Sequence, residues 1–427
     1  MGEITPVVVS CSRRFTGRDY QVALAMQHAG LLRLFITGIY RKNRTSLLGA
    51  AVRIFSSTLQ GKLNDRHMDG LDEERILDLP WIEGIGVLGR NLTGRWPGLS
   101  ATWDALSHRM HDRAAAAVVD HLQPSAELII SFEGVALRTF EAAKRRDALC
   151  VLDVGSAHEE FVRLSDGQHP GSRTAPLGRR RAYARIRGER RLADCILVPS
   201  KFVHDCLVEN GVSDEKILLL PYGYDFVPDI HVTRQRSRVH QKFTVVSVSS
   251  INHRKGTEYL LEAWSRCNFV DAELVLVGTP DAYGRDLLNH HNEGVRWVGQ
   301  IPNKEVSRYL AAADVFALAS LAEGSSLAVF EAMAHALPVV VTEKCGSVAR
   351  NGIDGFIVPA CDVDALENAL RSLHDDPDMA RAMGVRGQTL IREQYSWSHY
   401  RQRIASVCQD LLGSQPLQQI QRSVTSS

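Results

Sequence analysis

Short apolar runs that are rich in β-branched residues alternate along this chain with segments whose apolar residues recur at helical spacing. Strands and helices that alternate in this way form parallel sheets with helices on both faces. One series of runs ends near residue 200 and a second begins after residue 240, which predicts two doubly wound, Rossmann-like α/β domains. The predicted strands are 6–10, 34–37, 128–131, 150–154, 195–199, 244–249, 273–278, 295–298, 315–319 and 338–342.

The break between the two series lies near residue 235, in a polar stretch whose arginines alternate without apolar partners. We therefore predict a first domain over residues 1–232 and a second over 241–394. Residues 43–110 fit the alternation poorly and are interpreted as an insertion in the first domain. The Gln- and Ser-rich segment 413–427 has few apolar residues, so we expect it to be disordered. Because ligands of open α/β sheets bind beyond the carboxyl ends of the strands, the site is expected in a cleft between the domains.

The composition is that of a globular protein, with 44% hydrophobic and 23% charged residues among 427. No stretch reaches the ~18 apolar residues that a membrane-spanning helix needs. The first residues lack the basic segment of a signal peptide. The eight cysteines include no C-x-x-C pair, which disfavours a zinc site or a disulfide framework. We therefore expect a cytoplasmic protein.

Positive charge concentrates in the first half of the chain. The first 240 residues hold 33 Lys and Arg against 28 Asp and Glu, whereas the remainder holds 17 against 21. The arginine-rich segment 179–191 has two open interpretations: a solvated helix face, or a patch that contacts an anionic membrane or an acidic acceptor. Nucleic acid is disfavoured as a partner, because no aromatic residues are interleaved with the arginines. The cluster consists of Arg179, Arg180, Arg181, Arg185, Arg187, Arg190 and Arg191.

Two patterns match known motifs but lack their structural setting. Residues 84–89 read G-x-G-x-x-G, but no strand pattern precedes them, so a dinucleotide site is not expected. The D-x-D patterns that start at Asp362 and Asp376 each precede a helical pattern. Aspartate is a preferred helix N-cap, so we interpret both as caps rather than metal ligands. The histidines show no metal-binding spacing, and we predict no metal site.

The strongest candidate for chemistry lies in residues 322–342. A buried strand ends in a short loop, a helix starts near Ser326, and a second strand starts at residue 338. The free amides and the dipole at the start of a helix favour an anion. Glu323 stands in the loop, and Glu331 lies eight residues later inside an otherwise apolar helix, where a carboxylate needs a hydrogen-bonding partner. Sugar hydroxyls are suitable donors to it.

This segment resembles the E-x(7)-E motif of the family 4 glycosyltransferases, which have the GT-B fold. The resemblance covers most of residues 180–410. It implies that Glu323 lies beside the donor sugar as a catalytic residue, and that Glu331 holds the ribose hydroxyls of the donor. It also implies that four backbone amides cradle the sugar and phosphate. They belong to Gly324, Ser325, Ser326 and Leu327.

Residues 249–256 take the place of the family's first phosphate loop, which usually reads Gly-Arg-Leu, three residues and then Lys-Gly. Lys255 matches this form, and the resemblance implies that it is catalytic because it neutralises the leaving diphosphate. Ser250 stands where the family has an arginine. Arg254, next to Lys255, is the candidate to replace that missing charge.

The remaining parts of the resemblance are less specific. Residues 395–412 resemble a helix that crosses back to the first domain. Other segments imply contacts with the base of the donor and, in the first domain, with phosphate or the cleft. The candidates are Gln300 and Ile301 at the base, with Gly17, Arg18 and His158 in the first domain.

The function implied by the resemblance is a retaining, metal-independent transfer of a sugar from a nucleotide diphosphate-sugar to an acceptor. No cofactor is expected beside that donor substrate. A glycan, a lipid-linked molecule and a small molecule remain open as acceptors. Two alternatives also stay open. One is an epimerase or hydrolase of sugar nucleotides with the same fold. The other is a nucleotide-sugar-binding protein without transferase activity, which is kept open because Ser250 replaces the family's arginine.

Overall fold

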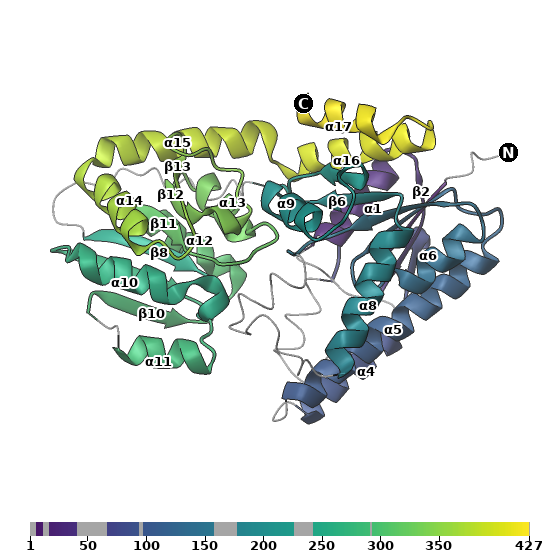
Figure 1. Ribbon diagram of the computed structural model, residues 1–427, viewed down its shortest axis with the longest axis horizontal. Helices are drawn as coiled ribbons and strands as arrows, with labels where there is room; N and C mark the ends of the chain where they lie inside the picture. Colours follow the sequence, from purple (N-terminus) through teal and green to yellow (C-terminus); the bar gives the residue numbers. More distant parts are fainter. Residues whose placement is uncertain are drawn as a thin grey trace.

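The computed structural model describes residues 6–11, 17–40, 66–93, 97–157, 177–225, 242–290 and 293–426. Two parallel sheets, with buried apolar layers on both faces, form the right and left halves of the molecule in Figure 1. The predicted fold class of two doubly wound α/β domains is therefore confirmed. The predicted boundary near residue 235 lies outside the described residues, because they resume at residue 242.

The first sheet has seven parallel strands in the order β3-β2-β1-β4-β5-β6-β7. Its side chains alternate between two buried layers, so that Val7 and Val9 face one layer and Val8 faces the other. The strands are β1 (Val7–Ser10), β2 (Leu32–Thr37), β3 (Ile76–Asp78), β4 (Leu128–Phe132), β5 (Leu149–Asp153), β6 (Cys195–Val198) and β7 (Ile217–Leu219). The helices are α1 (Arg18–His28), α4 (Pro80–Thr93), α5 (Pro97–His121), α6 (Leu137–Lys144), α8 (Leu177–Leu192) and α9 (Lys201–Glu209).

The second sheet has six parallel strands in the order β10-β9-β8-β11-β12-β13. Its central strand β11 is buried along its whole length, as expected for a parallel strand covered on both faces. The strands are β8 (Phe243–Val248), β9 (Ala272–Val277), β10 (Val295–Gly299), β11 (Val315–Leu318), β12 (Val339–Thr342) and β13 (Gly355–Val358). The helices are α10 (Thr257–Cys267), α11 (Ala282–His290), α12 (Asn303–Ala312), α13 (Leu327–Ala334), α14 (Val363–Asp375) and α15 (Pro377–Gln394).

Two helices at the end of the chain lie on the first domain (Figure 1, yellow). Helix α16 (Trp397–Leu412) packs against α1, and the Arg401 guanidinium donates to the Gln21 side chain at 2.6 Å. Helix α17 (Leu417–Ser426) covers β7, so the expectation of a disordered tail is wrong. The fully buried Ile420 anchors it, and the Gln421 amide donates to two backbone carbonyls beside β7. Leu417 and Ile420 have helical spacing that the Gln- and Ser-rich composition obscures.

Three short strands were not predicted, namely β3, β7 and β13. Each has only three or four residues, which is too few to show a period. The interpretation of residues 43–110 as an insertion is corrected in part, because β3 pairs with β2 as the edge of the first sheet and α5 begins within that range. Residues 41–65 lie outside the described part of the chain.

The two aspartates interpreted as helix caps are confirmed. The Asp362 carboxylate accepts from the Ala365 amide at 2.9 Å, and the Asp376 carboxylate accepts from the Met379 amide at the same distance. Residues 84–89 lie inside α4 instead of at a turn between a strand and a helix. Within the described ranges, none of the helices has the length and apolar character that crossing a bilayer requires.

Candidate active site

The loop between β11 and α13 is held by hydrogen bonds with two other segments. The Glu323 amide donates to the Lys344 carbonyl at 3.0 Å, and the Ser326 amide donates to the Cys345 carbonyl at 3.1 Å. From the first domain, the Ser200 hydroxyl donates to the Gly324 carbonyl at 2.6 Å. The Ser326 amide is thus already bonded within the protein, so it is not available to a ligand as predicted.

Gly324 is required by contact between the two domains. A Cβ atom on Gly324 would lie 1.8 Å from the carbonyl oxygen of Gly155, which belongs to the first domain. No side chain can fit at that distance. The backbone after β5 therefore meets the loop after β11 directly, which brings the carboxyl ends of both sheets together.

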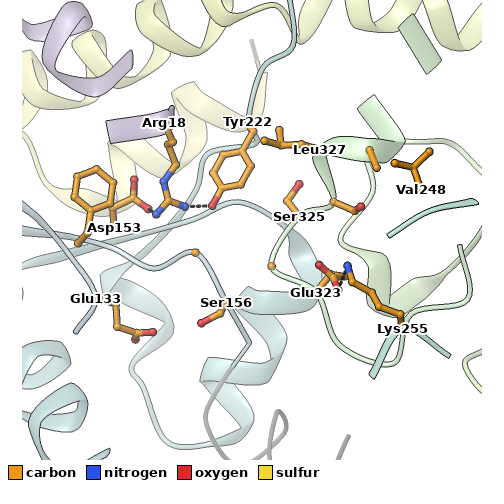
Figure 2. Close-up of a pocket in the computed structure, with 15 residues that line it drawn as sticks. Arg18, Glu133, Asp153, Ser156, Tyr222, Val248, Lys255, Glu323, Ser325 and Leu327 are labelled. Atoms are coloured by element: carbon orange, nitrogen blue, oxygen red, sulfur yellow. Dashed lines mark hydrogen bonds and ion pairs between the residues drawn. The ribbon is translucent and has the colours of Figure 1, made fainter. Parts of the chain in front are cut away.

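The Glu323 carboxylate binds two cations. Its Oε1 atom lies 2.6 Å from the Lys255 Nζ atom and 2.7 Å from an Arg254 guanidinium nitrogen. Lys255 is positioned by a short 3-10 helix (His253–Lys255), which the Asn252 side chain caps by accepting from the Lys255 amide at 3.0 Å. The structure thus brings the two predicted catalytic residues together, although they are far apart in the chain (Figure 2).

Arg254 stabilises the loop between β11 and α13 and does not line the cavity. Its guanidinium also donates to the Ala322 carbonyl at 2.7 Å. Ser250 is exposed and its hydroxyl accepts from the Asn252 side-chain amide at 3.2 Å. In this arrangement Arg254 acts on Glu323, and Lys255 is the cation on the second-domain side of the cavity.

A cavity of about 430 Å³ lies between the domains beside Glu323 and Lys255 (Figure 2). Its volume is within the range of small-molecule sites, which is about 300–1,000 Å³. The start of α13 forms one wall, and segments of the first domain form the opposite wall. The lining residues are Arg18, Phe132, Glu133, Asp153, Gly155, Ser156, Tyr222, Val248, Lys255, Glu323, Gly324, Ser325, Ser326, Leu327 and Ala328.

Arg18 is the buried cation of the first-domain wall. Gly17 starts α1 in the left-handed conformation, with φ of 80°, and thereby directs Arg18 inward. The guanidinium lies between the Phe132 and Tyr222 rings, 5.1 and 5.0 Å from their centres. It donates to the Tyr222 hydroxyl and pairs with the Asp153 carboxylate at 3.2 Å. Arg18 therefore lies at the cavity as predicted, but its charge is already partnered.

The first-domain wall carries two carboxylates that were not predicted from the sequence. Burial raises the pKa of the Asp153 carboxyl to about 6, although the Arg18 guanidinium opposes the rise. Glu133 pairs with Arg190 at 2.7 Å. Asp153 ends β5 and Glu133 follows β4. Polar residues at the carboxyl ends of adjacent parallel strands were the available signal for both.

Glu331 lies one helical turn beyond Leu327 on α13. Burial raises the pKa of its carboxyl, while a hydrogen bond from the Tyr224 hydroxyl opposes the rise. Gln300 and Ile301 follow β10 and do not line the cavity; the Gln300 side chain accepts from the Thr279 hydroxyl at 3.4 Å. His158 lies outside the described residues, so its predicted place in the cleft stays a prediction.

The arginine cluster is divided between the interior and the surface. Arg185 is largely buried and pairs with the fully buried carboxylates of Asp112 and Glu189. Arg190 is also buried and binds Glu133. The exposed arginines of the described side chains in α8 are Arg181, Arg187 and Arg191. Neither interpretation therefore applies to the whole cluster, because Arg185 and Arg190 are neither solvated nor available to a membrane or an acceptor.

Comparison with known proteins places this site in context. Residues 242–376 match the family model described as "Glycosyl transferases group 1". The chain is 29% identical over 210 residues to a GDP-mannose-dependent monoacylated alpha-(1-6)-phosphatidylinositol monomannoside mannosyltransferase of Corynebacterium glutamicum. The match covers 44% of this chain and 55% of that protein. It is 33% identical over 243 residues to the alpha-maltose-1-phosphate synthase of Mycolicibacterium smegmatis, covering 50% and 62%. The chain thus spans little more than half the length of these curated relatives.

Solved structures match over nearly the whole chain. The crystal structure of Anabaena HepE in complex with UDP and glucose has a TM-score of 0.61 at 16% identity, and the match covers 95% of this chain and 99% of that one. At that identity the likeness concerns the fold. The two domains therefore have the GT-B arrangement.

Proposed function

We propose that this chain is a retaining glycosyltransferase of family 4, which moves a hexose from a nucleotide diphosphate-sugar to an acceptor. The observation that carries the proposal is the Lys255–Glu323 pair at 2.6 Å, set beside the start of α13 at a cavity between two domains. The family model that matches residues 242–376 and the GT-B arrangement support it. The E-x(7)-E spacing of Glu323 and Glu331 supports the finer assignment.

In this proposal the second domain binds the donor. The diphosphate lies at the start of α13, where the helix dipole and free amides favour an anion, with Lys255 as its cation. Glu331 holds the ribose, and the segment of Gln300 and Ile301 lies toward the base. The donor sugar then occupies the cavity next to Glu323. UDP in the HepE complex and GDP-mannose in the name of the corynebacterial relative indicate two donor classes to try first.

The proposed transfer takes place on one face of the donor sugar. The bond between the anomeric carbon and the diphosphate oxygen breaks, and an acceptor hydroxyl forms the new bond from the same side. The departing diphosphate takes the proton of that hydroxyl. Lys255 and the amides of α13 stabilise the negative charge that develops on the diphosphate. In many enzymes, preorganised groups of this kind contribute more to the rate than any other single effect.

Turnover of a donor panel, with and without acceptors, tests the proposal against its two alternatives. Nucleotide sugars that bind raise the melting temperature and select the donor. Release of nucleoside diphosphate that depends on an acceptor, with a new glycoside of unchanged anomeric configuration, is expected. Epimerised or hydrolysed donor without acceptor would replace the proposal with the enzymatic alternative. Binding without any turnover would favour a binding protein.

Transfer is expected to proceed without a divalent cation, because Lys255 and the α13 amides can supply the positive field at the diphosphate. The rate with the best donor should be unchanged within about two-fold in excess chelator. Complete loss of transfer in chelator, restored by manganese, would contradict this expectation.

We further propose that the acceptor binds to the first domain and that α8 supports a peripheral contact with an anionic membrane. The name of the corynebacterial relative includes a phosphatidylinositol mannoside, which motivates a lipid acceptor. Each basic residue near anionic lipid contributes about 1 kcal/mol. Only arginines on the exposed side of α8 can contribute, since Arg185 and Arg190 pair with carboxylates of the same domain.

Sedimentation with vesicles checks the membrane contact. Wild-type protein is expected to bind vesicles rich in phosphatidylserine at low salt, and to dissociate as salt screens the charges. Combined replacement of Arg181, Arg187 and Arg191 by serine should abolish most of this binding without unfolding the protein, because all three side chains are exposed. Equal, negligible binding of the wild type to anionic and neutral vesicles would leave a soluble acceptor.

A further inference from the structure

An extended segment after β7 carries two tyrosines toward the cleft. Side chains two residues apart in an extended chain point to the same side. Here Tyr222 accepts a hydrogen bond from Arg18, on the first-domain wall of the cavity. Tyr224 donates its hydroxyl to the Glu331 carboxylate on α13 of the second domain. One short segment thus contacts both sides of the site.

The backbone around Tyr224 is fixed independently of Glu331. The Tyr224 amide donates to the Tyr395 carbonyl at 2.8 Å. The next residue, Asp225, accepts from the Trp397 amide at 2.9 Å. On the other side, a Cβ atom on Gly223 would lie 2.5 Å from the Ser396 carbonyl oxygen, so the two backbones touch. The hydroxyl of Tyr224 is therefore presented to Glu331 from a rigid support.

Glu331 faces the same side of α13 as the cavity. Leu327 and Ala328 line the cavity, and Glu331 follows them by four and three residues. Side chains at these spacings share one face of a helix, about 4.5 to 6 Å apart along its axis. A carboxylate has about four acceptor positions on its two oxygens. The Tyr224 hydroxyl uses one of them and leaves the others for hydroxyl groups of a ligand.

We propose that Tyr224 is a positioning residue, which orients the Glu331 carboxylate toward the ribose diol and so sets the preference for ribonucleotide over 2′-deoxyribonucleotide donors. This inference rests on the proposed function, because it assumes a nucleotide next to α13. The hydrogen bond from Tyr224 also opposes the rise in the pKa of Glu331 that burial causes, which favours the ionised acceptor that two ribose hydroxyls require.

The test compares the binding of UDP and GDP with that of their 2′-deoxy counterparts by calorimetry. Wild-type protein is expected to prefer the ribonucleotide of at least one base. Tyr224→Phe should weaken ribonucleotide binding about 3–10-fold, as for loss of one hydrogen bond, and leave binding of the deoxynucleotide nearly unchanged. In turnover assays, the donor KM should rise while kcat stays within about two-fold.

Two further variants separate positioning from a structural role. Tyr283→Phe is the matched control, because the Tyr283 hydroxyl also bonds a glutamate, Glu258, away from the cavity; it should keep the ribonucleotide preference. Glu331→Gln should lose most of that preference, and adding Tyr224→Phe to it should change little, since the two residues act as one unit.

Some outcomes would overturn the inference. Equal weakening of ribo- and deoxynucleotide binding by Tyr224→Phe would assign Tyr224 a structural role only. Full ribose preference in Tyr224→Phe would mean that Glu331 is oriented without it. Failure of the wild type to bind either nucleoside diphosphate would instead contradict the proposed function, and this inference with it.

Discussion

Replacement of Lys255 by alanine is expected to lower kcat about 10²–10³-fold, which is the usual cost of removing one preorganised group that stabilises charge in a transition state. The ammonium group of Lys255 is largely buried at the cavity and lies 2.6 Å from Glu323. In the proposed reaction the ammonium group stabilises the negative charge that develops on the diphosphate as its bond to the sugar breaks. The affinity for nucleoside diphosphate should fall as well, because the ground state carries the same phosphates.

Lys344→Ala is a suitable control for the loss of a positive charge near the site. The Lys344 ammonium lies over the Phe202 ring, 5.2 Å from its centre, and the residue does not line the cavity. Steady-state kinetics should therefore show little change in this variant. Near-normal turnover in a folded Lys255→Ala protein would refute the catalytic role assigned to Lys255.

Replacement of Glu323 by alanine should reduce turnover to a similar extent but with a different signature. The variant loses the carboxylate beside the donor sugar and releases Lys255 and Arg254 from their common partner. Nucleoside diphosphates do not require Glu323 in the proposed site, and the released Lys255 is free to bind phosphate. Their affinity should hence stay the same or increase while transfer falls about 10²–10³-fold.

The comparison with Glu323→Gln identifies which property of the residue matters. Glutamine keeps the size of the side chain but cannot neutralise two cations. If charge is the essential property, Glu323→Gln should be about as slow as Glu323→Ala. Thermal unfolding would show that both variants remain folded, since the loop is also held by the backbone bonds of residues 323 and 326. A folded Glu323→Ala variant with normal transfer would rule out the assigned role.

The α13 part of the site could be predicted because its residues are close together in the sequence, whereas Lys255, far from Glu323 in the chain, was predicted only through the resemblance of its loop. Glu323, Glu331 and the start of α13 belong to one loop and helix. Of the opposite wall only Arg18 was predicted, since α1, β4, β5 and the segment at Tyr222 meet only when the sheet forms. Their order across the sheet follows from long-range strand pairing, which local patterns do not contain.

The ion-pair partners of the arginine cluster could be predicted only in part for the same reason. One partner of Arg185, Glu189, lies four residues later on the same helix, but nothing near Arg185 in the sequence indicates the second buried carboxylate, Asp112. Asp112 is 73 residues away, and its carboxyl group accepts hydrogen bonds from the Arg138 and Thr139 amides, so it is held in position by the start of α6. A local count of charges therefore predicted more surface arginines than the folded protein has.

The contact between Gly324 and Gly155 restricts how such a site can diversify. A side chain at position 324 would collide with the backbone carbonyl of Gly155. One at position 155 would displace the end of the Arg18 side chain, whose guanidinium lies 2.5 Å from the Cβ position. Substitution is therefore excluded at position 324, and at position 155 it would require the Arg18 guanidinium to move away from Asp153 and Tyr222. Changes in substrate preference must arise at the flanking positions, and libraries for directed evolution are best built at Ser156, Ser325 and Leu327 with the glycine pair held constant.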